Sequence, residues 1–186
     1  FKIKEKLPLM KRRTAIKNLM IIAGGVAIFP SCSNDPAKAS IQLTNIDISA
    51  DQEALLAEIA ETIIPKTINA PGARDLNLHL FTLKMVDDCY STEEQQLFVS
   101  GLNGTDLLAK EKYNHVFIKC STQQKNELLT LAMKDENTPK EVATFLRITK
   151  QKVIQGFTNS KYVMTDLKQY EMVPGRYNGY FPADKV

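Results

Sequence analysis

The side chains best suited to chemistry in this sequence are two histidines, three cysteines and a pair of adjacent aspartates. His79 precedes Asp87 and Asp88 by two to three helical turns, so these groups could form an acid–base cluster only through tertiary packing. His115 and Cys120 could act as base and nucleophile, yet no other feature of a cysteine enzyme accompanies them. For His79, an exposed or hydrogen-bonded histidine is the simpler interpretation.

Motifs that bind redox cofactors are missing from the sequence. It contains no Cys-x-x-Cys-His for covalent haem, no Gly-x-Gly-x-x-Gly after a strand and no glycine-rich loop that could cradle phosphate. We therefore expect no flavin, haem or metal site in this chain. Cys89 and Cys120 could form a disulfide in an oxidising compartment, or remain two buried thiols.

The positive charge of the chain is concentrated at its beginning. Residues 1–31 hold seven Lys or Arg and one acid, a balance of +6, so the net +3 of the whole sequence leaves residues 32–186 at −3. A slightly acidic body without a Lys/Arg stripe lacks the electrostatic footprint of a protein that binds a phosphate backbone. Nucleic acid is therefore not an expected partner.

Residues 1–31 have the pattern of an export signal, with a charged start, a short apolar run and a small-residue end. Arg12, Arg13 and Lys17 resemble the twin-arginine signal. Phe29 to Cys32 resembles a bacterial lipobox, in which the cysteine is acylated; a plain signal peptide with Cys32 unmodified is the alternative. The uncharged stretch of about 17 residues is at the lower limit for spanning a bilayer, so we expect a signal rather than a transmembrane helix.

The elements that must position these side chains are helical. Residues 32–47 are polar at their start and predict a flexible tether. From residue 48 onward, apolar residues recur at three-and-four spacing behind helix-start signals, which predicts one all-α domain of about five helices. The expected helix starts are, in chain order, the capping box at Ser49, Leu76, the capping box at Thr92, Ser121, and Thr138 followed by Pro139. The second of these boxes opens a segment that we expect to be interrupted around Gly101 and Gly104.

The sequence after Gly156 predicts an irregular tail rich in Tyr, Pro and Gly. Its aromatic side chains could fold back over the helices or serve as anchors for a partner, and the sequence leaves both alternatives open. These aromatics are Tyr162, Tyr170, Tyr177, Tyr180 and Phe181.

Several separated motifs resemble the gluconate 2-dehydrogenase subunit 3 family over about residues 50–182. They are Glu61-Thr62-Ile63-Ile64-Pro65, Pro71-Gly72-Ala73, Asp87-Asp88-Cys89-Tyr90, Gly156-Phe157-Thr158-Asn159-Ser160 and the run from Tyr170 to Gly179 that includes Pro174-Gly175-Arg176-Tyr177. The chain departs from the family pattern in having one aromatic at Phe157 and in having Tyr180 where a cysteine is common.

The resemblance implies a small subunit without a redox centre of its own. In that family a large flavoprotein subunit of the glucose-methanol-choline type holds FAD, and a cytochrome c subunit holds haem. The small subunit is implied to help the flavoprotein fold, travel or stay docked, which predicts an exported, periplasmic lipoprotein anchored to the membrane. The residues expected to contact the partner are Pro65, Pro71, Gly72, Phe157, Pro174, Gly175, Arg176 and Tyr177.

Two other classes of function stay open at this point. A stand-alone envelope lipoprotein that binds a small ligand would need an enclosed apolar pocket with a few polar groups. A self-sufficient enzyme would need Asp87, Asp88 and His79 to converge. The loop between Pro65 and Ala73 could equally serve only to end one helix and turn the chain toward the next.

Overall fold

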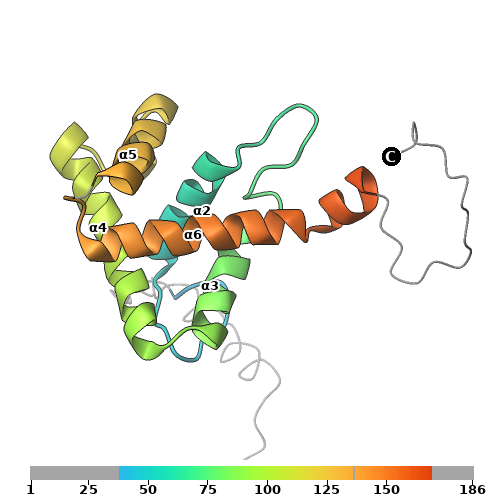
Figure 1. Cartoon of the computed structure of the whole chain (residues 1–186), viewed down its shortest axis with the longest axis horizontal. Coiled ribbons are helices and arrows are strands. Elements are labelled where there is room, and N and C mark those ends of the chain that lie inside the picture. The colour runs from blue at the N-terminus through green and yellow to red at the C-terminus, as the bar shows by residue number, and fades with distance from the viewer. Residues whose placement is uncertain (1–37, 136, 169–186) are drawn as a thin grey trace, which may run out of the picture. The chain divides into compact units, whose positions relative to one another are not determined.

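The computed structural model of this chain describes residues 38–135 and 137–168, and most of these residues lie in helices (Figure 1). The expected all-α fold with about five helices is confirmed, since the described residues contain five α-helices and a single isolated β-bridge. The elements are α2 (Ala50–Ile63), α3 (Leu78–Cys89), α4 (Thr92–Tyr113), the 3-10 turn η1 (Phe117–Lys119), α5 (Thr122–Lys134), α6 (Lys140–Thr158) and the π-helical turn η2 (Tyr162–Leu167).

Serine capping boxes start three of the helices. Ser49, Ser91 and Ser121 each accept a hydrogen bond from the backbone N–H three residues on, at 3.2 to 3.4 Å. In return, the backbone N–H of each serine donates to the side-chain oxygen of the Gln or Glu at that position. The box predicted at Thr92 is therefore one residue off, because Ser91 is the cap.

The expected cap at Thr138 is wrong. The helix α6 begins at Lys140, and Pro139 in front of it has an extended backbone with ψ 134° and no side-chain cap. Because the helix starts one residue later than the motif suggested, the Thr138 hydroxyl is too far outside the first turn to accept from its N–H groups.

The long helix α6 organises the bundle, and its tightest neighbour is α4. In Figure 1 α6 runs across the other helices, and its buried face carries Phe145, which meets Phe98 of α4 edge-on with ring centroids 4.9 Å apart. A Cβ on Gly101 would lie 2.2 Å from the Glu141 carbonyl oxygen of α6 and 2.4 Å from the Phe145 Cβ. The predicted interruption of α4 at its glycines is therefore wrong: the helix continues, and the glycines permit close packing.

The segment before α2 is packed against the bundle. The flexible tether predicted for residues 32–47 is therefore wrong for residues 38–47. Ile46 and Ile48 are buried in the main core. The buried carboxylate of Asp87 on α3 accepts from the backbone N–H groups of Thr44 at 2.9 Å, Asn45 at 2.6 Å and Ile46 at 3.1 Å. Local sequence patterns could not predict this contact because it joins residues more than 40 positions apart.

The C-terminal end also departs from the prediction of an irregular tail after Gly156. The helix α6 continues to Thr158, and η2 adds a π-helical turn from Tyr162 to Leu167. Val163 of that turn is buried. Residues 169–186 lie outside the described residues.

Replacing Gly101 with alanine should destabilise the fold far more than the same change at Gly104. The new methyl group at Gly101 would meet backbone atoms, whereas at Gly104 it would meet only the Val142 Cγ2 atom at 2.7 Å. Overpacking costs about 1–3 kcal/mol, and the gain in helix propensity from Gly to Ala offsets about 1 kcal/mol. In urea unfolding we expect Gly101→Ala to lose about 2 kcal/mol and Gly104→Ala less than about 1 kcal/mol. Equal losses would contradict the close crossing.

Removal of the Asp87 charge should destabilise the protein in a way that depends on pH. Burial raises the pKa of Asp87, but the three backbone N–H donors and Lys84 together outweigh burial and hold this pKa below its ordinary value. The charged form therefore stabilises the folded state above about pH 4, and this stabilisation is lost as the pH falls through the depressed pKa.

We expect Asp87→Asn to lower the free energy of unfolding by about 2–3 kcal/mol at neutral pH, the range for hydrogen bonds to a charged group. Wild type and variant should approach each other in strongly acidic solution, where wild-type Asp87 is also neutral. Urea unfolding at neutral and at acidic pH measures the difference in the free energy of unfolding between wild type and variant at each pH. A difference that stays constant with pH would show that the shape of the Asp87 side chain, and not its charge, holds the segment.

Candidate functional site

His79 is part of the packing between α2 and α3 rather than of a reactive cluster. It is only 8% exposed, its Nε2 lies 4.0 Å from Glu53, and its Nδ1 has no hydrogen-bond partner among the described residues. Burial lowers the pKa of His79, Glu53 raises it and Arg74 lowers it further, with a net decrease. Asp87 lies two turns farther along α3, about 12 Å by helical rise, and its oxygens are used by backbone donors.

Cys89 and Cys120 are free thiols, and the expectation that both thiols would be buried is wrong for Cys89. Cys89 is exposed and Cys120 is buried, and Cys120 Sγ faces the carbonyl oxygens of His115 and Val116 at 4.0 and 3.6 Å. Burial is the main cause that raises the pKa of Cys120, which keeps the thiol protonated and disfavours nucleophilic chemistry. Over residues 38–135 and 137–168, no group of His, Cys, Asp and Glu could hold a metal ion.

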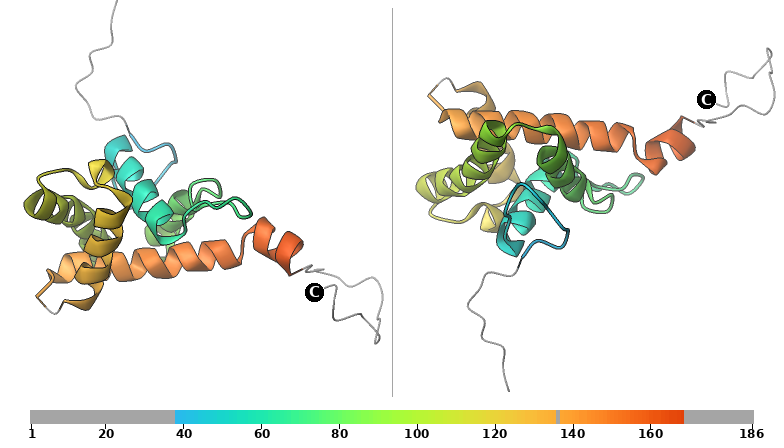
Figure 2. Two further views of the ribbon diagram at one scale, coloured as in Figure 1. Left: turned by 90° about the horizontal axis from the view of Figure 1, so that it is seen from above. Right: turned by 90° about the horizontal axis from the view of Figure 1, so that it is seen from below.

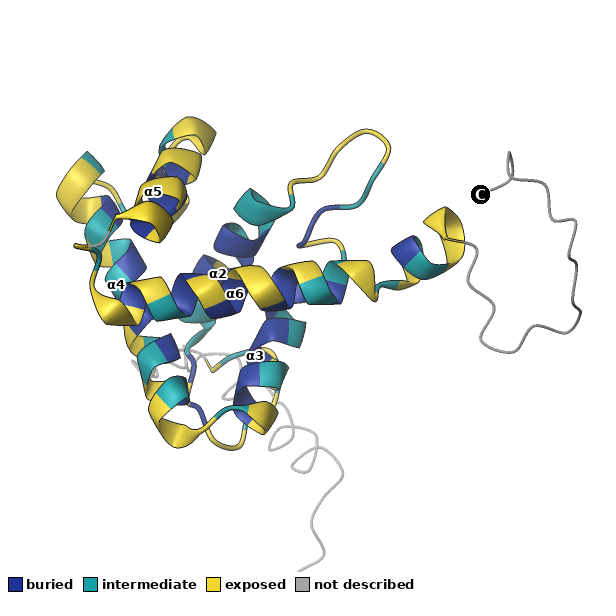
Figure 3. Cartoon of the chain, viewed as in Figure 1, coloured by how far each residue is buried: buried dark blue, intermediate teal, exposed yellow. Residues whose placement is uncertain are grey.

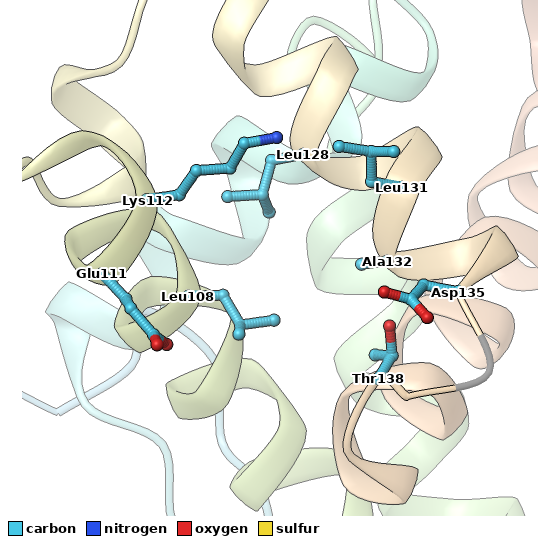
Figure 4. A pocket seen from close by; sticks show the side chains of 8 residues that line it. All are labelled: Leu108, Glu111, Lys112, Leu128, Leu131, Ala132, Asp135 and Thr138. Carbon is cyan, nitrogen blue, oxygen red and sulfur yellow. The ribbon is translucent and has the colours of Figure 1, made fainter.

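A groove between α4 and α5 is the best candidate for a small-ligand pocket (Figure 4). It has a volume of about 400 Å³ and an apolar floor, and it is open to solvent. In Figure 4 Asp135 and Thr138 lie next to each other on one side of the groove and Glu111 and Lys112 lie on the other side, and Lys112 is engaged with Glu127 at 2.7 Å. The groove therefore lacks the enclosed apolar volume with convergent polar groups that a small-ligand site requires.

The most elaborately built surface is the loop from Ile64 to Asn77, which joins α2 to α3 and projects from the bundle (Figures 1 and 2). The Glu61 carboxylate in the last turn of α2 accepts from the backbone N–H of Lys66 at 2.9 Å and of Arg74 at 2.8 Å. A Cβ on Gly72 would lie 2.4 Å from Glu61 Oε1. Glycine at this position therefore leaves room for the Glu61 carboxylate between the outgoing and returning segments of the loop. Glu61 thus fastens the base of the loop.

Ion pairs hold the same loop to the bundle. Arg74 pairs with Glu58 of α2 at 2.5 Å, and Glu58 also accepts from Lys125 of α5 at 2.7 Å. Asp75 pairs with Lys66 at 3.0 Å and accepts from the Gly72 N–H; the hydrogen bond from Lys66 is the main cause that lowers the pKa of Asp75. These contacts connect the loop to two helices.

The C-terminal end of α6 closes the loop from the other side. Phe157 packs with Tyr162 of η2 at a ring-centroid distance of 6.4 Å, and the Tyr162 hydroxyl donates to the Asn69 carbonyl at the loop tip at 3.0 Å. A second apolar cluster lies beneath these contacts. It consists of the buried residues Ala60, Ala73, Leu78 and Val153 with the partly buried Ile63, Ile64, Leu76 and Phe157 packed against it.

We call this region the loop end: residues 64–77 together with residues 157–162. Figure 3 shows its base buried and its tip exposed. Ile68 at the tip has a relative exposure of 103%, the highest among the exposed large apolar residues of the described chain. A single exposed apolar side chain is common on protein surfaces, so Ile68 points to an interface only together with the fastened loop that carries it.

The structure brings together the described residues that the sequence predicted to contact a partner. Pro65 is exposed, Pro71 and Phe157 are half-buried and Gly72 is buried, and all four belong to the loop end. The remaining predicted residues lie outside the described residues: Arg12, Arg13, Lys17, Cys32, Pro174, Gly175, Arg176 and Tyr177.

Neither Ile68 nor Arg74 was predicted from the sequence to belong to this surface. Tyr162 was predicted only as an aromatic that either folds back over the helices or anchors a partner, and it folds back onto Asn69. Ile68 was the one large apolar residue between Lys66 and Asn69, a signal that could have been noticed. The roles of Arg74 and Tyr162 depend on contacts with distant residues and left no local signal.

Comparison with known proteins gives one match to a family model. The model described as Gluconate 2-dehydrogenase subunit 3 matches residues 50–175, which include the whole loop end. No curated protein and no solved structure matches the chain.

Removing the Glu61 carboxylate should loosen the loop without unfolding the bundle. In Glu61→Ala the N–H groups of Lys66 and Arg74 lose their acceptor, which costs about 1.5–3 kcal/mol for opening of the loop. Amide hydrogen exchange at these two residues should accelerate about 10-fold or more, with little change at α4 and α6. Glu111→Ala, which removes an exposed carboxylate from α4, is the control and should leave the loop unchanged. Unaltered exchange in Glu61→Ala would show that other contacts suffice.

Proposed function

This chain belongs to the gluconate 2-dehydrogenase subunit 3 family, and on that premise we propose that it is the non-catalytic small subunit of a membrane-associated dehydrogenase complex. Its proposed role is to bind the flavoprotein subunit through the loop end and so to aid the maturation, export or docking of that subunit. The observation that carries this proposal is the rigidly fastened loop with Ile68 fully exposed at its tip.

The construction of the loop end suits a binding role. The Glu61 contacts and the pair of Arg74 with Glu58 fix the loop before any partner arrives, so association loses less conformational entropy than with a free loop. Ile68 then offers apolar surface at the tip, the exposed Pro65 offers more at the base, and Tyr162 adds an aromatic neighbour. A rigid apolar anchor within a polar rim is the usual composition of an interface centre.

The chemistry of the complex would belong to the partners. We propose that FAD is carried by a glucose-methanol-choline-type subunit and haem by a cytochrome c subunit. A small subunit that binds only the folded flavoprotein stabilises it by mass action, in proportion to the logarithm of its concentration over the dissociation constant.

Export and anchoring are the other parts of the proposal. Arg12, Arg13 and Lys17 would direct export, and acylation of Cys32 would hold the chain at the periplasmic face of a membrane. Within the described residues, no helix is long and apolar enough to cross a membrane.

Replacing Ile68 with aspartate should break the complex and leave the subunit folded. Because Ile68 is fully exposed, the change removes no core contact, and we expect affinity for the flavoprotein to fall about 30-fold or more, the loss typical of a hot-spot residue. The measurement is co-purification of the solubilised native complex with flavin absorbance read on the eluate. Leu107→Asp on α4, at a residue that is 62% exposed, is the matched control and should retain the flavin.

The outcomes separate the alternatives. Loss of flavin with Ile68→Asp but not with Leu107→Asp supports docking at the loop end. Loss with both variants would point to an interface elsewhere. A colourless wild-type eluate would overturn the subunit role and favour a stand-alone lipoprotein that binds a small ligand.

A further inference from the structure

A second surface lies on the outward face of α6, away from the main core. In both views of Figure 2 the helix runs along one side of the molecule, and Figure 3 shows exposed residues along its outer side. The residues of this outer side recur at three-and-four spacing, as one face of a helix requires. They are Lys140, Ala143, Thr144, Arg147, Lys150, Gln151 and Ile154.

Two adjoining shallow grooves extend this surface onto α5 and the end of α2. One groove of about 650 Å³ lies along α6, and one of about 470 Å³ lies between α5 and α2; Met133 and Lys150 line both. Lys134 contributes a further cation to the second groove. We call the two grooves together the basic face.

The charges of the basic face are unbalanced. Its four cations are Lys134, Lys140, Arg147 and Lys150, and no carboxylate lines either groove among the described residues. None of the four takes part in a salt bridge that the described residues form, which is also true of Lys38, Lys119, Lys152, Lys161 and Lys168. The basic face therefore gathers four cations without a carboxylate in its lining, although the exposed acids Asp135 and Glu141 adjoin Lys134 and Lys140 in sequence. This cluster corrects the expectation of a body without a Lys/Arg stripe.

The same face carries exposed apolar side chains between the cations. Met133 is 38% exposed and Ile154 is 42% exposed. No aromatic residue lines the grooves, whereas protein interfaces are enriched in aromatics and depleted in lysine. A cluster of four Lys and Arg residues on one helical surface is instead the pattern of a site for anionic lipid headgroups.

We propose that the basic face binds anionic lipid headgroups and lays α6 along the membrane surface. The cations would contact lipid phosphates, and Met133 and Ile154 would enter the headgroup region. Each Lys or Arg close to an anionic surface raises the partition constant about fivefold, so four act as a substantial contact. A single acyl chain binds membranes only marginally, and a basic patch is the kind of second contact that makes anchoring stable.

The test is sedimentation of residues 36–186 with lipid vesicles. These residues cluster as one unit, which contains the whole described core, and they lack the basic residues of the first segment. One set of vesicles is pure phosphatidylcholine and the other is an equimolar mixture with phosphatidylglycerol. We expect binding only to the mixture, with an affinity that falls as salt screens the charges.

The decisive variant replaces Lys134, Lys140, Arg147 and Lys150 with glutamine, and we expect it to lose about 100-fold or more of the affinity for anionic vesicles. The control replaces Lys38, Lys110, Lys112 and Lys119, which are exposed and line neither groove of the basic face, and removes the same charge. It should retain binding to within a few-fold. Thermal unfolding of both variants checks that they are folded.

Equal losses in the two variants would overturn the proposal, because net charge alone would then explain binding. Wild-type affinity that is the same for neutral and anionic vesicles would overturn it as well. A decisive variant that binds vesicles normally but no longer co-purifies with the flavoprotein would assign the basic face to an acidic protein segment. The vesicle assay contains no flavoprotein, so its failure leaves docking at the loop end untouched.

Discussion

The close crossing of α4 and α6 at Gly101 is the constraint on which the rest of the structure depends. With no side chain at Gly101, the backbone of α4 reaches the first turns of α6, and Phe98 and Phe145 meet edge-on at the core. The position of α6 then fixes the arrangement of the other helices, because α6 contacts α2, α3, α4 and α5. At its far end, a Cβ on Gly156 would lie 2.8 Å from Phe81 of α3, so both ends of α6 are fixed by small residues.

The buried carboxylate of Asp87 adds a second long-range contact of the same importance. It satisfies three backbone donors of the segment before α2, and that segment places Ile46 and Ile48 in the core. A buried charge is tolerated because its hydrogen bonds replace those of water. The aspartate that looked like a catalytic candidate in the sequence therefore acts as a structural acceptor, and the segment that looked like a tether belongs to the domain.

Local signals in the sequence predicted the helices well, and contacts between distant residues account for the errors. The capping boxes at Ser49 and Ser121 depend on neighbours three positions apart, so they could be recognised without a structure. Gly101 looked like a helix interruption because its packing partner, Glu141, lies 40 residues away. The candidate site follows the same rule: Pro65 and Gly72 carried turn signals, whereas the pairing of Arg74 with Glu58 and the contact of Tyr162 with Asn69 did not.

The two proposed surfaces adjoin each other, and under the proposed function this would let the chain hold a flavoprotein partner at a membrane without a redox centre of its own. Thr62 and Ile63 line one groove of the basic face, and the loop end begins at the next residue, Ile64. A flavoprotein bound at the loop end would thus lie beside a bilayer contacted by α6. Holding it there restricts its diffusion to the membrane surface, which raises its effective concentration toward a membrane-bound electron acceptor. Neither contact has to be strong alone, because each makes the other effectively intramolecular.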